Sequence, residues 1–355
     1  MKGKYYLLYL HPQSSYRGHI TAHTLFGAAC WALAALGEDV GALLARFSEP
    51  GFAFTRPFPY VYRGESKWRL FPAPPYQARL SELEKLLSLG NITQVTDMAK
   101  KVKGLRYLSP GVMAECRQGR WRSIDLVTKA LEGKLCFTQG ALWLSEEVRE
   151  IWPRQTWPEV PSLWQRVPLV RTAIDRSSGG VATGMLYTQE EVFIDRRCAG
   201  LWAGLWIAEG LEPKLWAALR YLEDSGIGGD RSTGRGHFTF SWEEWKDDPP
   251  TSEGDRFLNL SAYIPREGES EPLAYNLLSI RQKAENRMPL GGQRVYLAQL
   301  QAFAPGSLFQ GKEQAVGQPV LGRLVKMGQV GGHSVYYHGL TIPLWGRWEA
   351  REDGG

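Results

Sequence analysis

A glycine-rich segment with two arginines is the part of this sequence best suited to hold a phosphate group. It runs Gly226-Ile-Gly-Gly-Asp-Arg-Ser-Thr-Gly-Arg-Gly236 and holds five glycines in eleven residues. Glycine permits positive φ angles and close approach to another backbone, and consecutive exposed N–H groups can form an anion-binding concavity. Arginine adds forked donors that suit phosphate. We therefore expect contacts to an RNA backbone from Gly226, Gly228, Gly229, Arg231, Ser232, Thr233, Gly234, Arg235 and Gly236.

Two other interpretations of this segment are a nucleotide-binding loop and a purely structural connection. Gly229 to Gly236 loosely resembles a nucleotide-binding P-loop, but Arg235 stands in place of lysine and Gly236 in place of the Ser or Thr that binds magnesium. The expected order is also helix–loop–strand, whereas a P-loop follows a strand and precedes a helix. A tight helix-to-strand connection alone is expected to need only one or two glycines. The sequence therefore favours RNA binding.

A second segment carries charge close to glycines. Arg171-Thr-Ala-Ile-Asp-Arg176 precedes the pair Gly179-Gly180, and Gly184-Met-Leu-Tyr187 follows. These residues could place a second loop on the same ligand, so Arg171, Arg176, Gly179 and Gly180 join the candidate RNA contacts. An equally good interpretation is a salt bridge between Asp175 and a neighbouring arginine that holds a hairpin, and both can be true.

Alternating strand and helix patterns surround these segments. The helix at 21–36 has Thr21 or Thr24 as its cap and Gly37 at its end, and a helix at 212–224 has Pro213 near its start. Apolar or alternating runs predict strands. These strands are expected at 5–10, 52–63, 67–71, 199–207 and 237–242. The glycine-rich segment thus connects a helix to a strand.

The rest of the chain is expected to form an insertion and a second domain. Residues 100–165 look irregular and basic, with several Trp-Pro steps, and are expected to project from the core. Further strands are expected at 257–264, 295–303 and 335–344, after an acidic, Pro-containing linker. The predicted fold is α+β, with two ferredoxin-like (RRM-like) domains. These span 1–246, with an insertion at about 72–190 and the glycine-rich loop at 226–236, and 255–355.

Composition narrows the classes of function. The chain has 355 residues, a net charge of +5 and an apolar fraction of 43%, which suffices for a sizeable core. No cysteine pair has CxxC spacing and no histidine lies in ligand register with one, so no metal site and no cofactor are expected. No apolar run is long enough to span a membrane. We expect a cytoplasmic protein with reduced thiols. Its cysteines are Cys30, Cys116, Cys136 and Cys198.

Three passages together carry a family resemblance. They are the helix start Thr24-Leu-Phe-Gly-Ala28, the segment from Arg171 to Arg176 with its glycines, and the loop between Ser225 and Phe238. Their order and spacing resemble the RAMP superfamily of CRISPR proteins and, more narrowly, the fourth subunit of the type III-A (Csm) interference complex. One departure is that Thr21-Ala-His23 stands where the family often has His-Ser-Asp.

The resemblance implies a non-catalytic RNA-binding subunit in antiviral defence. It implies two ferredoxin-like domains that hold the repeat-derived 5′ tag of a guide RNA. His23, as a histidine at a helix start, is also a candidate RNA contact. It also implies contacts to a large signalling subunit and to a repeating backbone subunit. In relatives, an inserted hairpin, or thumb, reaches the guide–target duplex, so target RNA is contacted indirectly. We expect this thumb within 100–165.

Two other functions remain open. Some RAMP proteins are endoribonucleases that use a histidine near the first helix, and His19 and His23 lie there. Such a histidine could move the 2′-OH proton while a cation stabilises the phosphorane, with Arg17 or Tyr16 as its nearby partners. A pure scaffold, whose glycines only shape a protein interface, is the third function. Salt dependence of RNA binding separates the scaffold from the other two.

Overall fold

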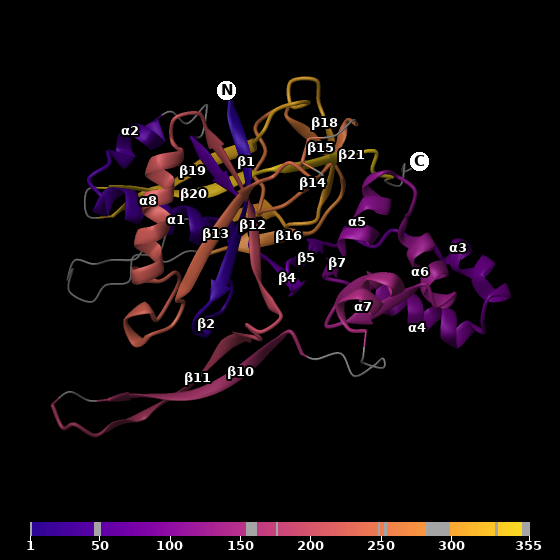
Figure 1. Ribbon diagram of the computed structural model, residues 1–355, viewed down its shortest axis with the longest axis horizontal. Helices are drawn as coiled ribbons and strands as arrows, with labels where there is room; N and C mark the ends of the chain where they lie inside the picture. The colour runs from indigo at the N-terminus through magenta and orange to yellow at the C-terminus, as the bar shows by residue number, and fades with distance from the viewer. Residues whose placement is uncertain are drawn as a thin grey trace.

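The fold combines helices and sheets in an α+β arrangement (Figure 1). The computed structural model describes residues 2–45, 51–153, 162–174, 177–247, 249–251, 254–281, 299–330 and 333–349. The α+β prediction is confirmed. The order of the helices and strands decides which of the candidate residues lie close together.

A six-stranded sheet organises the N-terminal part. Its spatial order is β13-β1-β12-β4-β5, with β3 also paired to β12. Every residue of β12 is buried, and the middle of β1 is buried as well, which explains why both appear as apolar runs in the sequence. The predicted strands are confirmed. Their bounds are β1 Gly3–Pro12, β3 Phe52–Phe54, β4 Phe58–Arg63, β5 Ser66–Arg69, β12 Ala199–Ala208 and β13 Phe238–Glu244.

Two helices cover one face of this sheet. They are α1 (Ala22–Ala35) and α8 (Glu212–Ser225), which pack on one another, and the short α2 (Val40–Ala45) follows α1. Thr21 caps α1, since its Oγ1 accepts from the Thr24 N–H at 3.1 Å. Apolar stripes of both helices share one core with the sheet. The buried residues of these stripes are Ala22, Leu25, Phe26, Ala29, Ala32, Leu33, Leu215, Ala218, Leu219 and Leu222.

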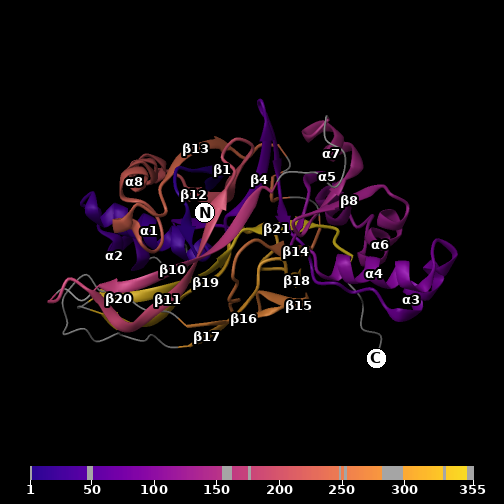
Figure 2. The ribbon, with the colours of Figure 1, turned by 90° about the horizontal axis from the view of Figure 1, so that it is seen from below.

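Residues 71–151 fold into an ordered helical unit, so the expectation of an irregular stretch was wrong. The longest helix, α4, buries Val95, Ala99 and Val102, a helical spacing that its exposed lysines conceal in the sequence. Figure 2 shows these helices at the end of the molecule away from α1 and α8. The elements are β6 Phe71–Pro72, α3 Leu80–Glu84, a 3₁₀ turn Lys85–Ser88, α4 Ile92–Lys103, β7 Tyr107–Leu108, α5 Pro110–Arg117, α6 Ser123–Leu131, β8 Leu135–Thr138, β9 Ala141–Leu144 and α7 Ser145–Ile151.

A long hairpin of β10 (Trp164–Ile174) and β11 (Val181–Ile194) projects from the body (Figure 1). Its strands pair from Trp164↔Ile194 outward, and β2 (Tyr16–Arg17) attaches its base to the body by pairing with β11. The projecting element is therefore this hairpin, and the placement of the projection within 100–165 was wrong. The error arose because Trp-Pro steps suggested irregular structure in 100–165, while the hairpin expected around Asp175 was not identified as the projection.

The C-terminal part is built of strands. In its described residues, 254–281, 299–330 and 333–349, it has no helix, so the expected second ferredoxin-like order is not met there. The final predicted strand splits at Ile342: β20 pairs with β19, while β21 closes a four-stranded sheet of order β15-β18-β14-β21. The bounds are β14 Arg256–Asn259, β15 Ser270–Ala274, β16 Leu277–Ile280, β17 Leu300–Phe303, β18 Leu308–Gly311, β19 Leu321–Val330, β20 His333–Thr341 and β21 Pro343–Gly346.

One core joins all three parts. A single cluster of buried side chains includes Leu7 of β1, Val112 of α5 and Leu258 of β14. Arg117 reinforces the junction, because its buried side chain donates to the carbonyl oxygens of Trp345 at 2.7 Å and Pro249 at 2.6 Å. The N-terminal sheet, the helical unit and the C-terminal strands are thus packed against each other.

Candidate RNA-binding site

The glycine-rich loop needs most of its glycines for its own conformation. Gly226, Gly228, Gly234 and Gly236 have positive φ angles. At Gly236 an added Cβ would lie 2.0 Å from the carbonyl oxygen of Ile227, which no side chain tolerates. The expectation that this connection needs only one or two glycines was therefore wrong. Glycine content alone therefore does not indicate a ligand, and the side chains around the loop must be considered.

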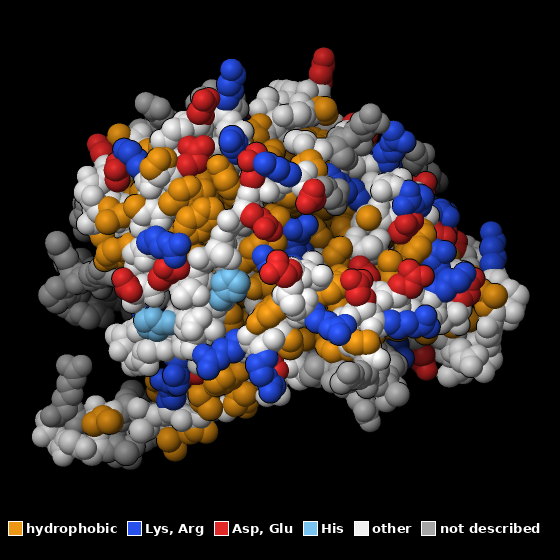
Figure 3. All heavy atoms as spheres, viewed as in Figure 1, with side chains coloured by type: hydrophobic (Ala, Val, Ile, Leu, Met, Phe, Trp, Pro, Cys, Tyr) orange, Lys and Arg blue, Asp and Glu red, His pale blue; other side chains and the backbone are white. Residues whose placement is uncertain are grey.

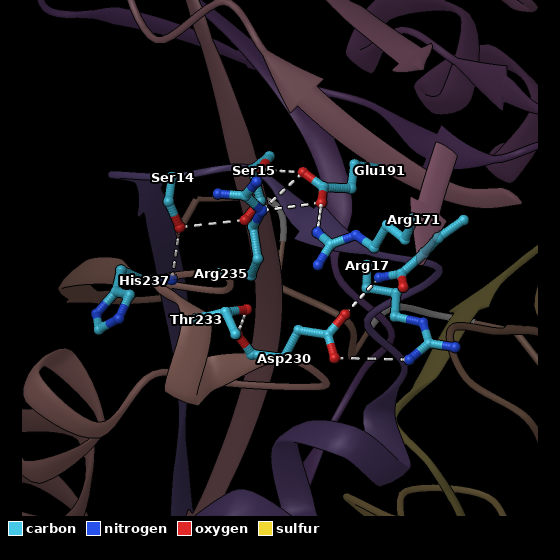
Figure 4. A network of polar contacts seen from close by, with 10 residues as sticks. Ser14, Ser15, Arg17, Arg171, Glu191, Asp230, Thr233, Arg235 and His237 are labelled. Atoms are coloured by element: carbon cyan, nitrogen blue, oxygen red, sulfur yellow. Dashed lines mark hydrogen bonds and ion pairs between the residues drawn. The ribbon is translucent and has the colours of Figure 1, made fainter. Parts of the chain in front are cut away.

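Glu191 of β11 forms the centre of the polar network in Figure 4. Its side chain is fully buried, yet it receives three donors. Ser15 Oγ donates to Oε2 at 2.6 Å, Arg235 Nε lies 2.8 Å from Oε2, and Arg171 donates to Oε1. The two segments singled out in the sequence therefore meet, on a carboxylate that neither contains.

The charge of this network is positive overall. Burial alone would raise the pKa of Glu191, but hydrogen bonds from Ser15, Arg235 and Arg171 outweigh it and hold the pKa below its usual value. One carboxylate thus faces two guanidinium groups, and both arginine side chains keep some exposure, 24% for Arg171 and 32% for Arg235. Glu191 therefore compensates one of the two positive charges, and one positive charge of this group is left uncompensated.

A second set of contacts fastens the loop to the hairpin and to β2. Gln189 of β11 donates to Asp230, and Arg17 of β2 lies 3.7 Å from the same carboxylate. Asp230 itself has a left-handed φ of 61°, and its carbonyl accepts from Thr233 Oγ1 at 2.9 Å. Ser14 Oγ accepts from the His237 N–H at 3.0 Å. Hairpin, β1–β2 turn and glycine-rich loop therefore form one site.

Sequence reasoning placed none of five further residues in this site: Ser15, Arg17, Gln189, Glu191 and Asp230. Arg17 was named only as a possible partner of a catalytic histidine. The only available signal was the alternation along β11, which places Gln189 and Glu191 on one face, toward the body. Nothing in the local sequence around Glu191 marks it as a buried carboxylate. Its pairing partners lie far away in sequence, so composition gave no indication that the carboxylate is buried.

The outer part of the loop presents free donors to solvent. A 3₁₀ turn covers Arg231–Thr233, and Ser232, Thr233 and Gly234 are exposed. Within the described part of the chain, the backbone N–H groups of Gly228, Gly229 and Ser232 donate to no acceptor. Neighbouring N–H groups that point outward beside positive side chains are an arrangement that binds anions.

Other predicted residues lie elsewhere. Gly179 and Gly180 form the exposed turn of the hairpin, and the register Arg171↔Tyr187 puts that turn beyond the network. Arg176 and the proposed Asp175 salt bridge lie outside the described residues. His23 lies in the first turn of α1 and packs against β20, where its ring stacks on that of Tyr337 with the ring centroids 4.8 Å apart.

The environment of His23 is that of a packing residue. Its Nδ1 accepts from the His338 N–H at 3.2 Å, and burial lowers the pKa of His23 to about 4. A neutral ring enclosed by β20 lacks the charge that would attract phosphate. The contacts of His23 attach the C-terminal strands to the first helix, and none of them is to a residue of the Glu191 network.

Among the described residues, no group of three or more His, Cys, Asp and Glu side chains is placed to hold a metal ion. None of their helices is long and apolar enough to cross a membrane.

Comparison with solved structures gives the fold. The chain aligns with the crystal structure of the Csm1–Csm4 cassette in complex with pppApA, at a TM-score of 0.57 and 21% identity, covering 98% of this chain and 99% of the other. It also aligns with the Csm3–Csm4 subcomplex of the type III-A CRISPR-Cas interference complex, at 0.62 and 16%, covering 95% and 99%. The subunit common to both is Csm4. This chain has the Csm4 fold. No protein-family model and no curated protein sequence matches it.

Proposed function

We propose that this protein is the RNA-binding subunit of a type III-A CRISPR effector complex that holds the repeat-derived 5′ tag of the guide RNA. The observation that carries the proposal is the glycine-rich loop. It offers unpaired N–H groups beside a network in which two arginines share one carboxylate. Donors and residual positive charge at one loop suit the backbone of RNA.

The hairpin is proposed to act as the thumb that reaches the guide–target duplex. Among its described residues, five large hydrophobic side chains are exposed. Val170 is 72% exposed, Leu186 71% and Ile174 66%, and Tyr187 and Phe193 are exposed to a lesser degree. Figure 3 shows hydrophobic side chains along this projection. Exposed apolar groups on a projecting ribbon indicate a surface that becomes covered, and base faces or a neighbouring subunit would cover it.

Bridging between subunits completes the proposal. Structures with this fold are known from complexes of Csm4 with Csm1 and with Csm3, so we infer contacts to the large signalling subunit and to the backbone subunit, in the cytoplasm, for antiviral defence. The N-terminal strands and helices β1, α1, β4, β12, α8 and β13 are proposed as a ferredoxin-like unit. Catalysis is not part of the proposed role.

One variant tests the role of the loop. Gly229 has an ordinary φ, and an added Cβ would meet only Arg17 Cδ at 3.5 Å, so Gly229→Glu adds a negative charge without backbone strain. Gly104→Glu is the matched control, at the far end of α4, where an added Cβ makes ordinary contacts of 3.5 and 3.6 Å.

Fluorescence anisotropy with guide RNA provides the measurement, comparing a tag at the 5′ end with the same tag at the 3′ end. We expect salt-sensitive binding that prefers the 5′ tag, weakened at least tenfold by Gly229→Glu and little changed by Gly104→Glu. Equal weakening by the two variants, or no preference for the 5′ tag, would refute the proposed role of the loop.

The endoribonuclease alternative now centres on His19. This side chain is exposed, and Arg166 NH2 lies 3.4 Å from its ring, so a base and a cation for the phosphorane are adjacent. His23 lacks such access. If guide precursor RNA is cleaved by the wild type and not by His19→Ala, the nuclease function replaces the proposed one.

A further inference from the structure

A second group of cations lies at the base of the hairpin, apart from the glycine-rich loop. We call Arg56, Arg106, Arg166 and His19 the hairpin-base cluster. Arg56 follows β3, Arg106 precedes β7, Arg166 lies in β10 and His19 lies between β2 and α1. Four separate segments of the chain thus contribute basic side chains: Arg166 contacts the ring of His19, and the charges of Arg56 and Arg106 act on the same ring.

Hydrogen bonds of the backbone and side chains hold these residues in position. Arg166 NH2 lies 3.4 Å from each ring nitrogen of His19, and its NH1 lies 3.1 Å from Glu190 Oε2. The Arg106 N–H donates to the Gly140 carbonyl at 2.8 Å, and the Arg56 N–H donates to the Leu260 carbonyl at 2.9 Å. The main chains of Arg56 and Arg106 are therefore anchored to the body, and Arg166 is held by its place in β10 and its contacts with His19 and Glu190.

The cluster is only partly compensated, by the ion pair between Arg166 and Glu190. In the part of the chain that the structure describes, neither Arg56 nor Arg106 forms an ion pair with a carboxylate. Partial burial, and then the charges of Arg56, Arg166 and Arg106, lower the pKa of His19, while Glu190 is the acid that opposes them. Like charges gathered in this way repel one another, and an anionic ligand would relieve the repulsion.

We propose that the hairpin-base cluster binds the phosphodiester backbone of single-stranded RNA, as a binding site distinct from the glycine-rich loop. The proposal rests on the proposed function and adds a second contact point for the same ligand. Glu191 compensates the arginines of the loop, whereas Arg56 and Arg106 keep their full charge. Arg17, whose side chain is 52% exposed, lies on β2 between the two sites, so one strand of RNA could contact both.

Single-stranded RNA fits this geometry better than a free nucleotide does. The cations come from separate elements along the hairpin base rather than from one closed loop, which suits successive phosphates of a chain. The exposed ring of His19 adds a surface on which a base could stack. A chain leaving the cluster would next meet the apolar side chains of the hairpin.

The test uses the full-length chain with two charge-matched triple variants. One is Arg56→Ala/Arg106→Ala/Arg166→Ala. The control is Lys100→Ala/Lys101→Ala/Lys103→Ala, which removes the same charge from exposed positions of α4 at the other end of the molecule (Figure 1). Binding of a labelled single-stranded RNA is measured by anisotropy over a range of salt, with circular dichroism to verify folding.

We expect the arginine variant to lose affinity roughly 100-fold at low salt. Its slope of log affinity against log salt should fall by about 2, since each phosphate contact to a single strand contributes about 0.7. The lysine control should lose less than tenfold. Unlabelled RNA should compete with the label, and ATP at equal phosphate concentration should not.

The outcomes separate this inference from the proposed function. If the wild type binds RNA and the two triple variants weaken binding equally, the hairpin-base cluster is not a specific binding site, while the proposed function stands. If ATP competes as well as RNA, the ligand is a nucleotide and the inference is wrong. If the wild type binds no RNA, the inference falls together with the proposed function.

Discussion

Arg235 and Glu191 lie 44 residues apart in sequence, yet the Arg235 Nε donates to Glu191 Oε1 at 2.9 Å. A residue chosen from the sequence as a phosphate ligand is thus also a structural cation that neutralises a buried carboxylate. The pair joins the glycine-rich loop to the hairpin, so the shape of the proposed RNA site depends on an ion pair within the protein.

Glu191→Gln tests this dependence. The amide keeps the shape of the side chain but removes the charge that two arginines share, so we expect the free energy of unfolding to fall by about 2–3 kcal/mol. Glu190→Gln is the control, because that carboxylate is 48% exposed in its pair with Arg166 and should cost about 0.5 kcal/mol. Urea unfolding of both variants gives the comparison, and equal losses would contradict a structural role for the buried pair.

Backbone strain at the loop gives the next prediction. Gly236→Ala places a Cβ 2.0 Å from the Ile227 carbonyl oxygen, whereas Gly234→Ala places one in open space, with φ angles of +72° and +79°. Gly234→Ala should lower the free energy of unfolding by about 1–2 kcal/mol, from the left-handed backbone alone. Gly236→Ala should lower it by at least about 2 kcal/mol more, because the Ile227 carbonyl must also move. Urea unfolding measures both, and similar losses would show that the loop adjusts freely.

How much the sequence predicts depends on how local each feature is. The strands at 5–10 and 199–207 and the capped helix after Thr21 follow from local apolar patterns, and the structure confirms them. The helical unit was missed because the stripe of α4 is short and lies among lysines. Glu191 and the hairpin-base cluster could not be found, since contacts between distant segments create them.

The buried histidines give a pH dependence with a definite sign. Burial lowers the pKa of His338 to about 3 and that of His23 to about 4. Both values lie below the 6.5 of an unfolded chain, so the unfolded state binds more protons between these limits. Stability is therefore fully present above about pH 6.5 and falls as the pH is lowered toward 4.

His338→Phe isolates this effect. Neither ring nitrogen of His338 has a hydrogen-bond partner in the described residues, so the substitution removes a titrating group without removing a bond. Between pH 7 and pH 5 we expect the wild type to lose about 2 kcal/mol more stability than the variant. Urea unfolding at both pH values measures the difference. Parallel losses would mean that His338 takes up its proton in the folded state without penalty.

The apolar face of the hairpin yields a prediction about target RNA. Val170→Ser/Leu186→Ser changes side chains that are 72% and 71% exposed, so the free energy of unfolding should change by no more than about 0.5 kcal/mol. Affinity of the assembled complex for target RNA should nevertheless fall, since the thumb would lose its contact with the duplex.

The matched control for that variant is Leu80→Ser on α3. Leu80 is 74% exposed and lies in the helical unit, at the other end of the molecule from the hairpin tip (Figure 1). Target binding is measured with guide-loaded complexes that contain the wild-type chain, the hairpin variant or the control. Loss of target binding only in the hairpin variant supports the thumb. If complexes with the hairpin variant fail to assemble, the exposed side chains contact a neighbouring subunit instead, and the thumb assignment is wrong.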